Sequence, residues 1–186
     1  MGWDKALLGY TEASGQGKPQ IECAYDLLAP FCARVFISTR PDQGKQPGYE
    51  RLAQIQDLPQ FTGIGPLGGI LSAMTTYPQA AWLVLACDLP FVTQETIRYL
   101  LEHRDPEKSA TAFISTHDGL PEPLCAVWEA GNLEQAGQWL QQGIQCPRKL
   151  LAKSGVCLVE QKDPHWLDNV NDPKEYKKAL KKLNKP

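Results

Sequence analysis

The chain has 186 residues, which is enough for one domain that buries its own core without help from disulfides or metals. Hydrophobic residues make up 42% and charged residues 22%, and the formal net charge of -2 gives no electrostatic basis for binding nucleic acid. No apolar run is long enough to span a bilayer and no signal peptide is recognisable, so we expect a soluble, cytoplasmic protein that binds no membrane and keeps its six cysteines as reduced thiols.

Helical and strand-like segments alternate through the first half of the chain. Residues 20–31 carry apolar side chains at helical spacing, and a short β-rich run follows at 34–39. A helix is expected at 67–75, after a glycine-rich turn, and then a nearly continuous apolar strand at 82–86. A strand without polar alternation is typical of a sheet that helices cover on both faces.

The alternation continues to the end of the chain. Thr93 is a suitable N-cap for the next helix, and Asp172 for the last one. The pattern predicts helices at 93–103, 133–142, 147–153 and 173–183, and strands at 110–115, 124–128 and 156–159. These elements indicate one domain over residues 1–186, with a Rossmann-like three-layer α/β/α fold around a mostly parallel sheet.

Ligands of such sheets bind beyond the carboxyl ends of the strands, so the residues after each strand are the first candidates for chemistry. Asp88 follows the apolar strand at 82–86 directly and could hold a magnesium ion there. The alternative is that Asp88 only caps the helix that begins near Thr93.

Other candidates carry weaker signals when each is taken alone. The glycine-rich segment 63–70 opens into a helix and would let backbone approach a ring or a phosphate, although an ordinary connector is as good an explanation. Lys5 could offer a point charge to a triphosphate. The Asn-rich segment before the last helix could be no more than a cap. The three histidines stand apart, with no triad around them.

Taken together and in order, five segments resemble the molybdenum cofactor guanylyltransferase family, whose members are nucleotidyltransferases related to sugar-nucleotide pyrophosphorylases. The matching segments are Met1-Gly2-x-Asp4-Lys5-Ala6-Leu7-Leu8, Gly65-Pro66-Leu67-x-Gly69, Cys87-Asp88-x-Pro90-Phe91, Glu122-Pro123-Leu124 and Asn169-Val170-Asn171-x-Pro173. The resemblance implies a nucleotide-diphospho-sugar transferase type of fold. It also implies the transfer of GMP from GTP to molybdenum-molybdopterin, with release of pyrophosphate.

The resemblance also implies a role for each matching residue. Lys5 would stabilise the triphosphate, and Asp88 would bind the Mg²⁺ cofactor. Asp57 falls where the family has an acidic residue that contacts the nucleoside. The guanine pocket would be bordered by Gly65, Pro66, Leu67 and Gly69, and the pterin side by Glu122, Asn169 and Asn171. Proteins that mature molybdoenzymes are further candidate partners.

The start of the chain departs from the family pattern. Family members begin with a strand and a glycine-rich loop, roughly Leu-Ala-Gly-Gly-x-Ser-x-Arg, directly before the segment that here starts at Met1. We therefore expect a domain that is truncated relative to the family, without a central strand and the amides that cradle a triphosphate. Three alternatives remain open: an incomplete gene model of an active enzyme, a related transferase that uses CTP or a sugar phosphate, and a catalytically silent binding module.

Overall fold

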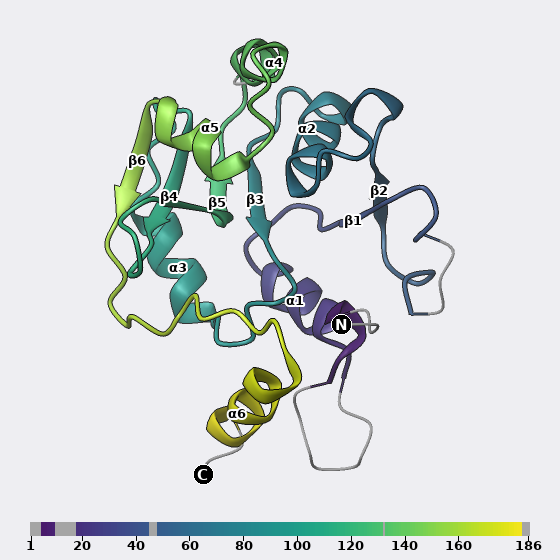
Figure 1. Ribbon diagram of the computed structural model, residues 1–186, viewed down its shortest axis with the longest axis vertical. Coiled ribbons are helices and arrows are strands. Elements are labelled where there is room, and N and C mark those ends of the chain that lie inside the picture. The colour runs from purple at the N-terminus through teal and green to yellow at the C-terminus, as the bar shows by residue number, and fades with distance from the viewer. Residues whose placement is uncertain (1–4, 10–17, 45–47, 132, 184–186) are drawn as a thin grey trace.

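The computed structural model describes residues 5–9, 18–44, 48–131 and 133–183, and it has the expected α/β class (Figure 1). The helices are α1 (Gln20–Leu28), α2 (Pro66–Thr76), α3 (Gln94–Glu102), α4 (Leu133–Gln141), α5 (Pro147–Lys153) and α6 (Pro173–Leu183). The strands are β1 (Ile37–Thr39), β2 (Gln54–Gln56), β3 (Trp82–Leu85), β4 (Ala110–Ile114), β5 (Pro121–Trp128) and β6 (Val156–Val159). Two short 3-10 helices cover Lys5–Leu7 and Pro59–Phe61.

The strands form two separate sheets. One has four strands in the order β3-β5-β4-β6, in which β5 runs antiparallel to both of its neighbours and the other three strands point the same way. The other sheet is the parallel pair β1-β2. Helix α2 contacts β1, β2 and β3, so one helix connects the two sheets across the gap between β1 and β3.

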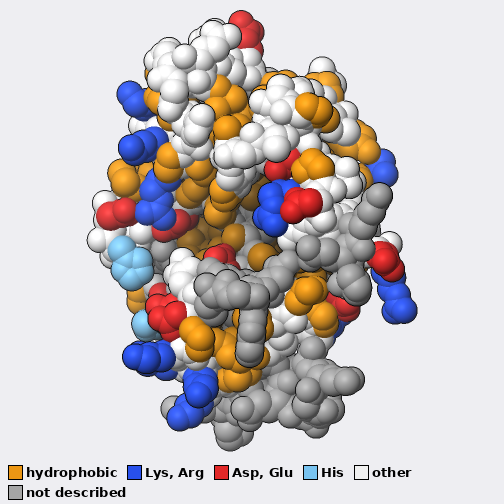
Figure 2. All heavy atoms as spheres, turned by 45° about the vertical axis from the view of Figure 1, so that its right-hand side comes forward, with side chains coloured by type: hydrophobic (Ala, Val, Ile, Leu, Met, Phe, Trp, Pro, Cys, Tyr) orange, Lys and Arg blue, Asp and Glu red, His pale blue; other side chains and the backbone are white. Residues whose placement is uncertain are grey.

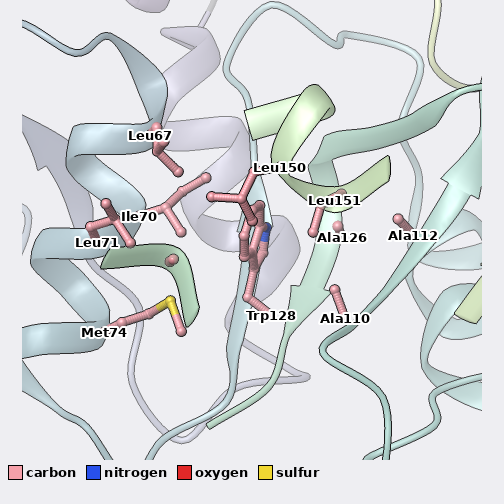
Figure 3. Close-up of a cluster of buried hydrophobic side chains, with 11 residues drawn as sticks. Leu67, Ile70, Leu71, Met74, Ala110, Ala112, Ala126, Trp128, Leu150 and Leu151 are labelled. Carbon is pink, nitrogen blue, oxygen red and sulfur yellow. The ribbon is translucent and has the colours of Figure 1, made fainter. Parts of the chain in front are cut away.

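One face of the four-stranded sheet packs against α2, α4 and α5 (Figure 3). The strands present mostly small side chains on this face, among them Ala110, Ala112 and Ala126, and the helices fill the space with leucines. Trp128 is the largest fully buried side chain there, and its ring nitrogen donates a hydrogen bond of 3.1 Å to the carbonyl of Pro123. Strand residues two apart share a face, which is why alternate positions recur in this cluster.

The opposite face of the same sheet packs against α1 and α3. Phe113, Cys125 and Val127 alternate with the alanines of the first face and meet Ile97 and Leu100 of α3. Both faces of the sheet are therefore covered, and the expected three-layer arrangement is confirmed.

Several helix boundaries follow from local chemistry. The side chain of Thr93 accepts a hydrogen bond from the amide of Thr96, which confirms it as the cap of α3. Asp172 accepts hydrogen bonds from two amides of the first turn of α6, at 2.6 and 2.9 Å. Helix α1 ends earlier than expected because Pro30 has no amide hydrogen with which to continue the ladder.

The structure differs from the sequence-based expectations in the strands. The pattern did not reveal β2, and β5 begins three residues earlier than expected, at Pro121. Full burial of the apolar strand was also a wrong expectation, because all four residues of β3 are only partly buried. The physical reason is that β3 is an edge strand among the described residues and a cavity lies beside it, so its side chains are not covered on the side of β1.

Candidate functional site

Two cavities meet at Asp88. The larger one, about 530 Å³, lies between the two sheets, and the smaller one, about 340 Å³, lies at the carboxyl end of β3 next to β5 and α5. Ala86, Asp88 and Leu124 line both of them. Two ligands, one in each cavity, would therefore meet beside Asp88, which comes three residues after the end of β3.

The larger cavity is walled by elements on four sides. Strands β1 and β3 border it within the sheet layer, while α1 and α2 contribute residues such as Ala24 and Ile70. Most of this lining is apolar, and the face shown in Figure 2 is hollowed near its centre with hydrophobic side chains around the hollow. Polar side chains lie at the ends of three strands: Thr39 is the last residue of β1, Asp57 follows β2, and Asp88 comes three residues after the end of β3. The cavity thus offers an apolar interior and a polar end, as ligand pockets of α/β proteins do.

A close approach of α2 to the polar end depends on glycine. A Cβ atom on Gly69 would stand only 2.2 Å from the hydroxyl oxygen of Ser38 and 3.6 Å from a carboxylate oxygen of Asp57. Gly65 has a φ of 64°, a backbone conformation that glycine adopts without strain. These two glycines and Pro66 line the larger cavity. Leu67 differs, because its side chain is fully buried in the core (Figure 3) and it is not among the described residues that line either cavity.

Asp57 holds its position through its own backbone. Its amide donates a hydrogen bond of 2.9 Å to the carbonyl of Thr39, which extends the pairing of β1 and β2 into the cavity. Burial raises the pKa of the Asp57 carboxyl above its ordinary value, and the positive charge of Arg40 opposes that shift. A carboxylate that is partly removed from water gains more from a ligand that donates hydrogen bonds to it.

The smaller cavity gathers two of the three residues predicted for the acceptor side. Glu122 lines it from β5, and Asn169 lines it from the segment before α6. The amide of Val170 donates a hydrogen bond of 3.0 Å to the carbonyl of Asp88, which fixes this segment beside the strand end. Asn171 is different, because it is exposed and does not line the described part of either cavity. Its backbone amide donates a hydrogen bond of 2.7 Å to the carboxylate of Glu175 in α6.

Lys5 lies at the start of the 3-10 helix Lys5–Leu7, and its neighbour Ala6 lines the larger cavity. The position of the Lys5 side chain lies outside what the structure describes, as do Met1, Gly2 and Asp4 of the same motif. Its predicted role near the triphosphate therefore remains a prediction.

Sequence reasoning missed Arg148, the one lysine or arginine among the described residues that line the smaller cavity. Its guanidinium donates hydrogen bonds to Asp118 at 2.9 Å and to Glu122 at 2.6 Å. Arg148 stands 60 positions after Asp88, beyond a proline at the start of α5, and no motif in the sequence connects the two.

The described residues favour positioning and electrostatics over covalent chemistry. Cys125 lines the smaller cavity, but burial raises the pKa of its thiol to about 12, so it is not a thiolate nucleophile near neutral pH. Across the part of the chain that the structure describes, no three histidine, cysteine or acidic side chains converge on a metal position. Asp88 and Asn169 do offer oxygen atoms to one cavity, and oxygen is the ligand that Mg²⁺ prefers. Asp88 and Asn169 are therefore the residues that would hold such an ion.

The described part of the chain contains no helix that is both long and apolar enough to cross a bilayer.

The chain is similar in sequence to known proteins of one family. Residues 1–159 match the family model of the MobA-like NTP transferase domain. A molybdenum cofactor biosynthesis bifunctional protein of Synechocystis is 33% identical over 176 residues, which cover 95% of this chain but 49% of that protein. The chain thus spans about half the length of that relative. A probable molybdenum cofactor guanylyltransferase of Bacillus anthracis is 32% identical over 180 residues, with 92% of this chain and 88% of the relative covered.

Solved structures share the fold. The molybdopterin-guanine dinucleotide biosynthesis protein A of Archaeoglobus fulgidus aligns with a TM-score of 0.76 at 23% identity, over 98% of this chain and 91% of that one. A 2-C-methyl-D-erythritol 4-phosphate cytidylyltransferase of Thermus thermophilus aligns with a TM-score of 0.68 at 15% identity, over 96% and 93% of the two chains. The chain therefore belongs to the MobA-like NTP transferase family and is a nucleotidyltransferase.

Proposed function

We propose that this chain transfers GMP from GTP to molybdenum-molybdopterin and releases pyrophosphate. The observation that carries the proposal is the position of Asp88 on the wall that two cavities share, because a transferase must bring two ligands to one reacting centre. The names of the relatives supply the identity of the two ligands.

GTP would occupy the larger cavity. Its guanine base would lie against the turn of Gly65 and Gly69, with Asp57 accepting hydrogen bonds from the nucleoside. Its phosphates would extend toward Asp88, and Lys5 would neutralise part of their charge. The pterin would enter the smaller cavity, beside Asn169.

The chemistry is a displacement at the α-phosphorus of GTP. A phosphate oxygen of the pterin forms the new bond to that phosphorus, and the bond to the bridging oxygen breaks, so that pyrophosphate leaves with the electron pair. Mg²⁺ held by Asp88 would supply charge neutralisation between the phosphates. No covalent intermediate is needed, because positioning and electrostatic stabilisation do the work in reactions of this class.

The direct test is a transfer assay with the chain, Mg²⁺, molybdenum-molybdopterin and each nucleotide in turn. The proposal predicts pyrophosphate release and a guanine dinucleotide product with GTP, and much less of either with CTP. Faster transfer from CTP than from GTP would show that the chain is a cytidylyltransferase instead. Pterin binding without pyrophosphate release from any nucleotide would show that the chain is a catalytically silent binding module.

A further inference from the structure

The ion pairs around Arg148 join the smaller cavity to a loop outside it. The guanidinium contacts Glu122, which lines the cavity, and Asp118, which lies on the β4-β5 turn and does not line it. The side chain of Arg148 is 31% exposed, that of Glu122 21% and that of Asp118 44%. Arg148 thus stands at the rim of the cavity between an inner and an outer carboxylate.

The carboxylate of Asp118, which lies outside the cavity, is held in place without help from Arg148. Its second oxygen accepts a hydrogen bond of 3.2 Å from the amide of Leu120. The same turn is closed by hydrogen bonds between the backbones of Ser115 and Gly119, and of Ser115 and Leu120. Asp118 is therefore a fixed charge that the turn presents to Arg148, and the turn does not have to open for the pair to break.

The balance of charge in the smaller cavity is unfavourable for an anion. Asp88 and Glu122 contribute two carboxylates to its described lining, while Arg148 is the one permanently positive side chain there. A guanidinium binds a phosphate through parallel hydrogen bonds in the way it binds a carboxylate. An anionic ligand and Asp118 would therefore compete for the same donors of Arg148.

We propose that Arg148 binds the anionic group of the acceptor substrate, and that Asp118 lowers the affinity for it by competing for the guanidinium. The inference rests on the proposed function for the identity of the acceptor, but its physical content is anion binding at Arg148. Asp118 thereby sets how tightly the acceptor binds and how readily the product leaves, and Glu122 keeps Arg148 oriented toward the cavity.

The test measures binding of inorganic phosphate to the full chain by calorimetry at constant ionic strength, without nucleotide or Mg²⁺. The substitution Asp118→Asn keeps the shape of the side chain and its hydrogen bond to the turn, and should tighten phosphate binding several-fold. The matched control is Asp163→Asn, because Asp163 is also exposed and accepts an amide hydrogen bond two residues ahead, from His165, and it has no arginine partner in the described structure. This control changes the net charge equally and should leave the affinity unchanged.

Arg148→Gln should abolish the gain when it is combined with Asp118→Asn. The inference is overturned if Asp118→Asn does not tighten phosphate binding, if Asp163→Asn tightens it as much, or if the gain survives the loss of Arg148. Undetectable phosphate binding by both the parent and the Asp118→Asn variant also overturns it. Because no nucleotide is present, these outcomes are independent of whether GTP is the donor, which the transfer assay decides.

Discussion

At the scale of single residues, Asp57 links stability to binding. Its pKa is raised in the folded protein because burial disfavours the charged carboxylate. The stabilisation that comes from the protonated Asp57 carboxyl is fully present at pH values below the pKa that this carboxyl has in the unfolded chain. It is lost as the pH rises through the higher pKa of the folded state. At neutral pH, the folded protein therefore carries a partly desolvated charge in the larger cavity.

We expect Asp57→Asn to raise the melting temperature slightly at neutral pH, because the amide carries no charge to desolvate. The advantage over the parent should shrink as the pH falls and Asp57 becomes protonated. The same variant should bind GTP more weakly, since the amide cannot replace both acceptor oxygens. Melting curves across a pH series test the first effect. A variant that is less stable than the parent at neutral pH but not at low pH would contradict the sign of the shift.

Gly65, Gly69 and Asp88 could be singled out from the sequence because they lie in short motifs beside strand ends. The structure places all three in the lining of the larger cavity, and their role in nucleotide binding stays a prediction. Arg148 could not be predicted, because its place at the rim depends on how α5 packs against β5. Local sequence carries no information on that contact.

At the level of helices and strands, replacing two helical glycines by alanine should change the free energy of unfolding in opposite directions. A Cβ atom on Gly68 of α2 would lie 2.5 Å from the backbone carbonyl oxygen of Phe61, whereas one on Gly137 of α4 would meet nothing within 4 Å. Gly68→Ala should therefore destabilise the protein by about 1–3 kcal/mol, through forced movement of the backbone. Gly137→Ala should stabilise it by about 0.5–1 kcal/mol, through helix propensity.

Urea denaturation of the two variants measures both effects on the free energy of unfolding. Equal effects of the two substitutions would show that α2 does not pack against the 3-10 helix Pro59–Phe61 as described.

Element boundaries were predictable where local chemistry sets them. The ranges of α5, β6 and α6 agree with the sequence pattern because prolines, the Asp172 cap and apolar periodicity mark them. Strand β2 could not be foreseen, since its three residues include two glutamines and it exists only through pairing with β1. The antiparallel direction of β5 was equally hidden, because a strand has the same pattern in either direction.

At the scale of the whole molecule, the division into two sheets predicts that the β1-β2 pair opens at a lower free energy than the four-stranded sheet. The β1-β2 pair has two short strands and borders the larger cavity, whereas β5 lies between two neighbours in the larger sheet. A two-stranded sheet is marginal by itself and depends on the helices that cover it. Regions with few buried contacts open at lower free energy than the core.

Native-state hydrogen exchange should therefore show faster exchange for the amides of Ile37 and Asp57 than for those of β4 and β5. Addition of GTP with Mg²⁺ should slow the exchange of Ile37 and Asp57 selectively, because the nucleotide would bridge the two sheets. Uniform protection across both sheets in the free protein would contradict this account.

The guanylyltransferase assignment is tested most directly by a nucleotide titration followed by thermal unfolding, with GTP and CTP each added with and without Mg²⁺. GTP with Mg²⁺ at about a hundred times its dissociation constant should stabilise the fold by about 2.7 kcal/mol, and CTP should not. Asp88→Asn should remove the magnesium dependence, while Asp163→Asn should retain it. Equal stabilisation by both nucleotides, or a full magnesium effect in Asp88→Asn, would contradict a guanylyltransferase site centred on Asp88.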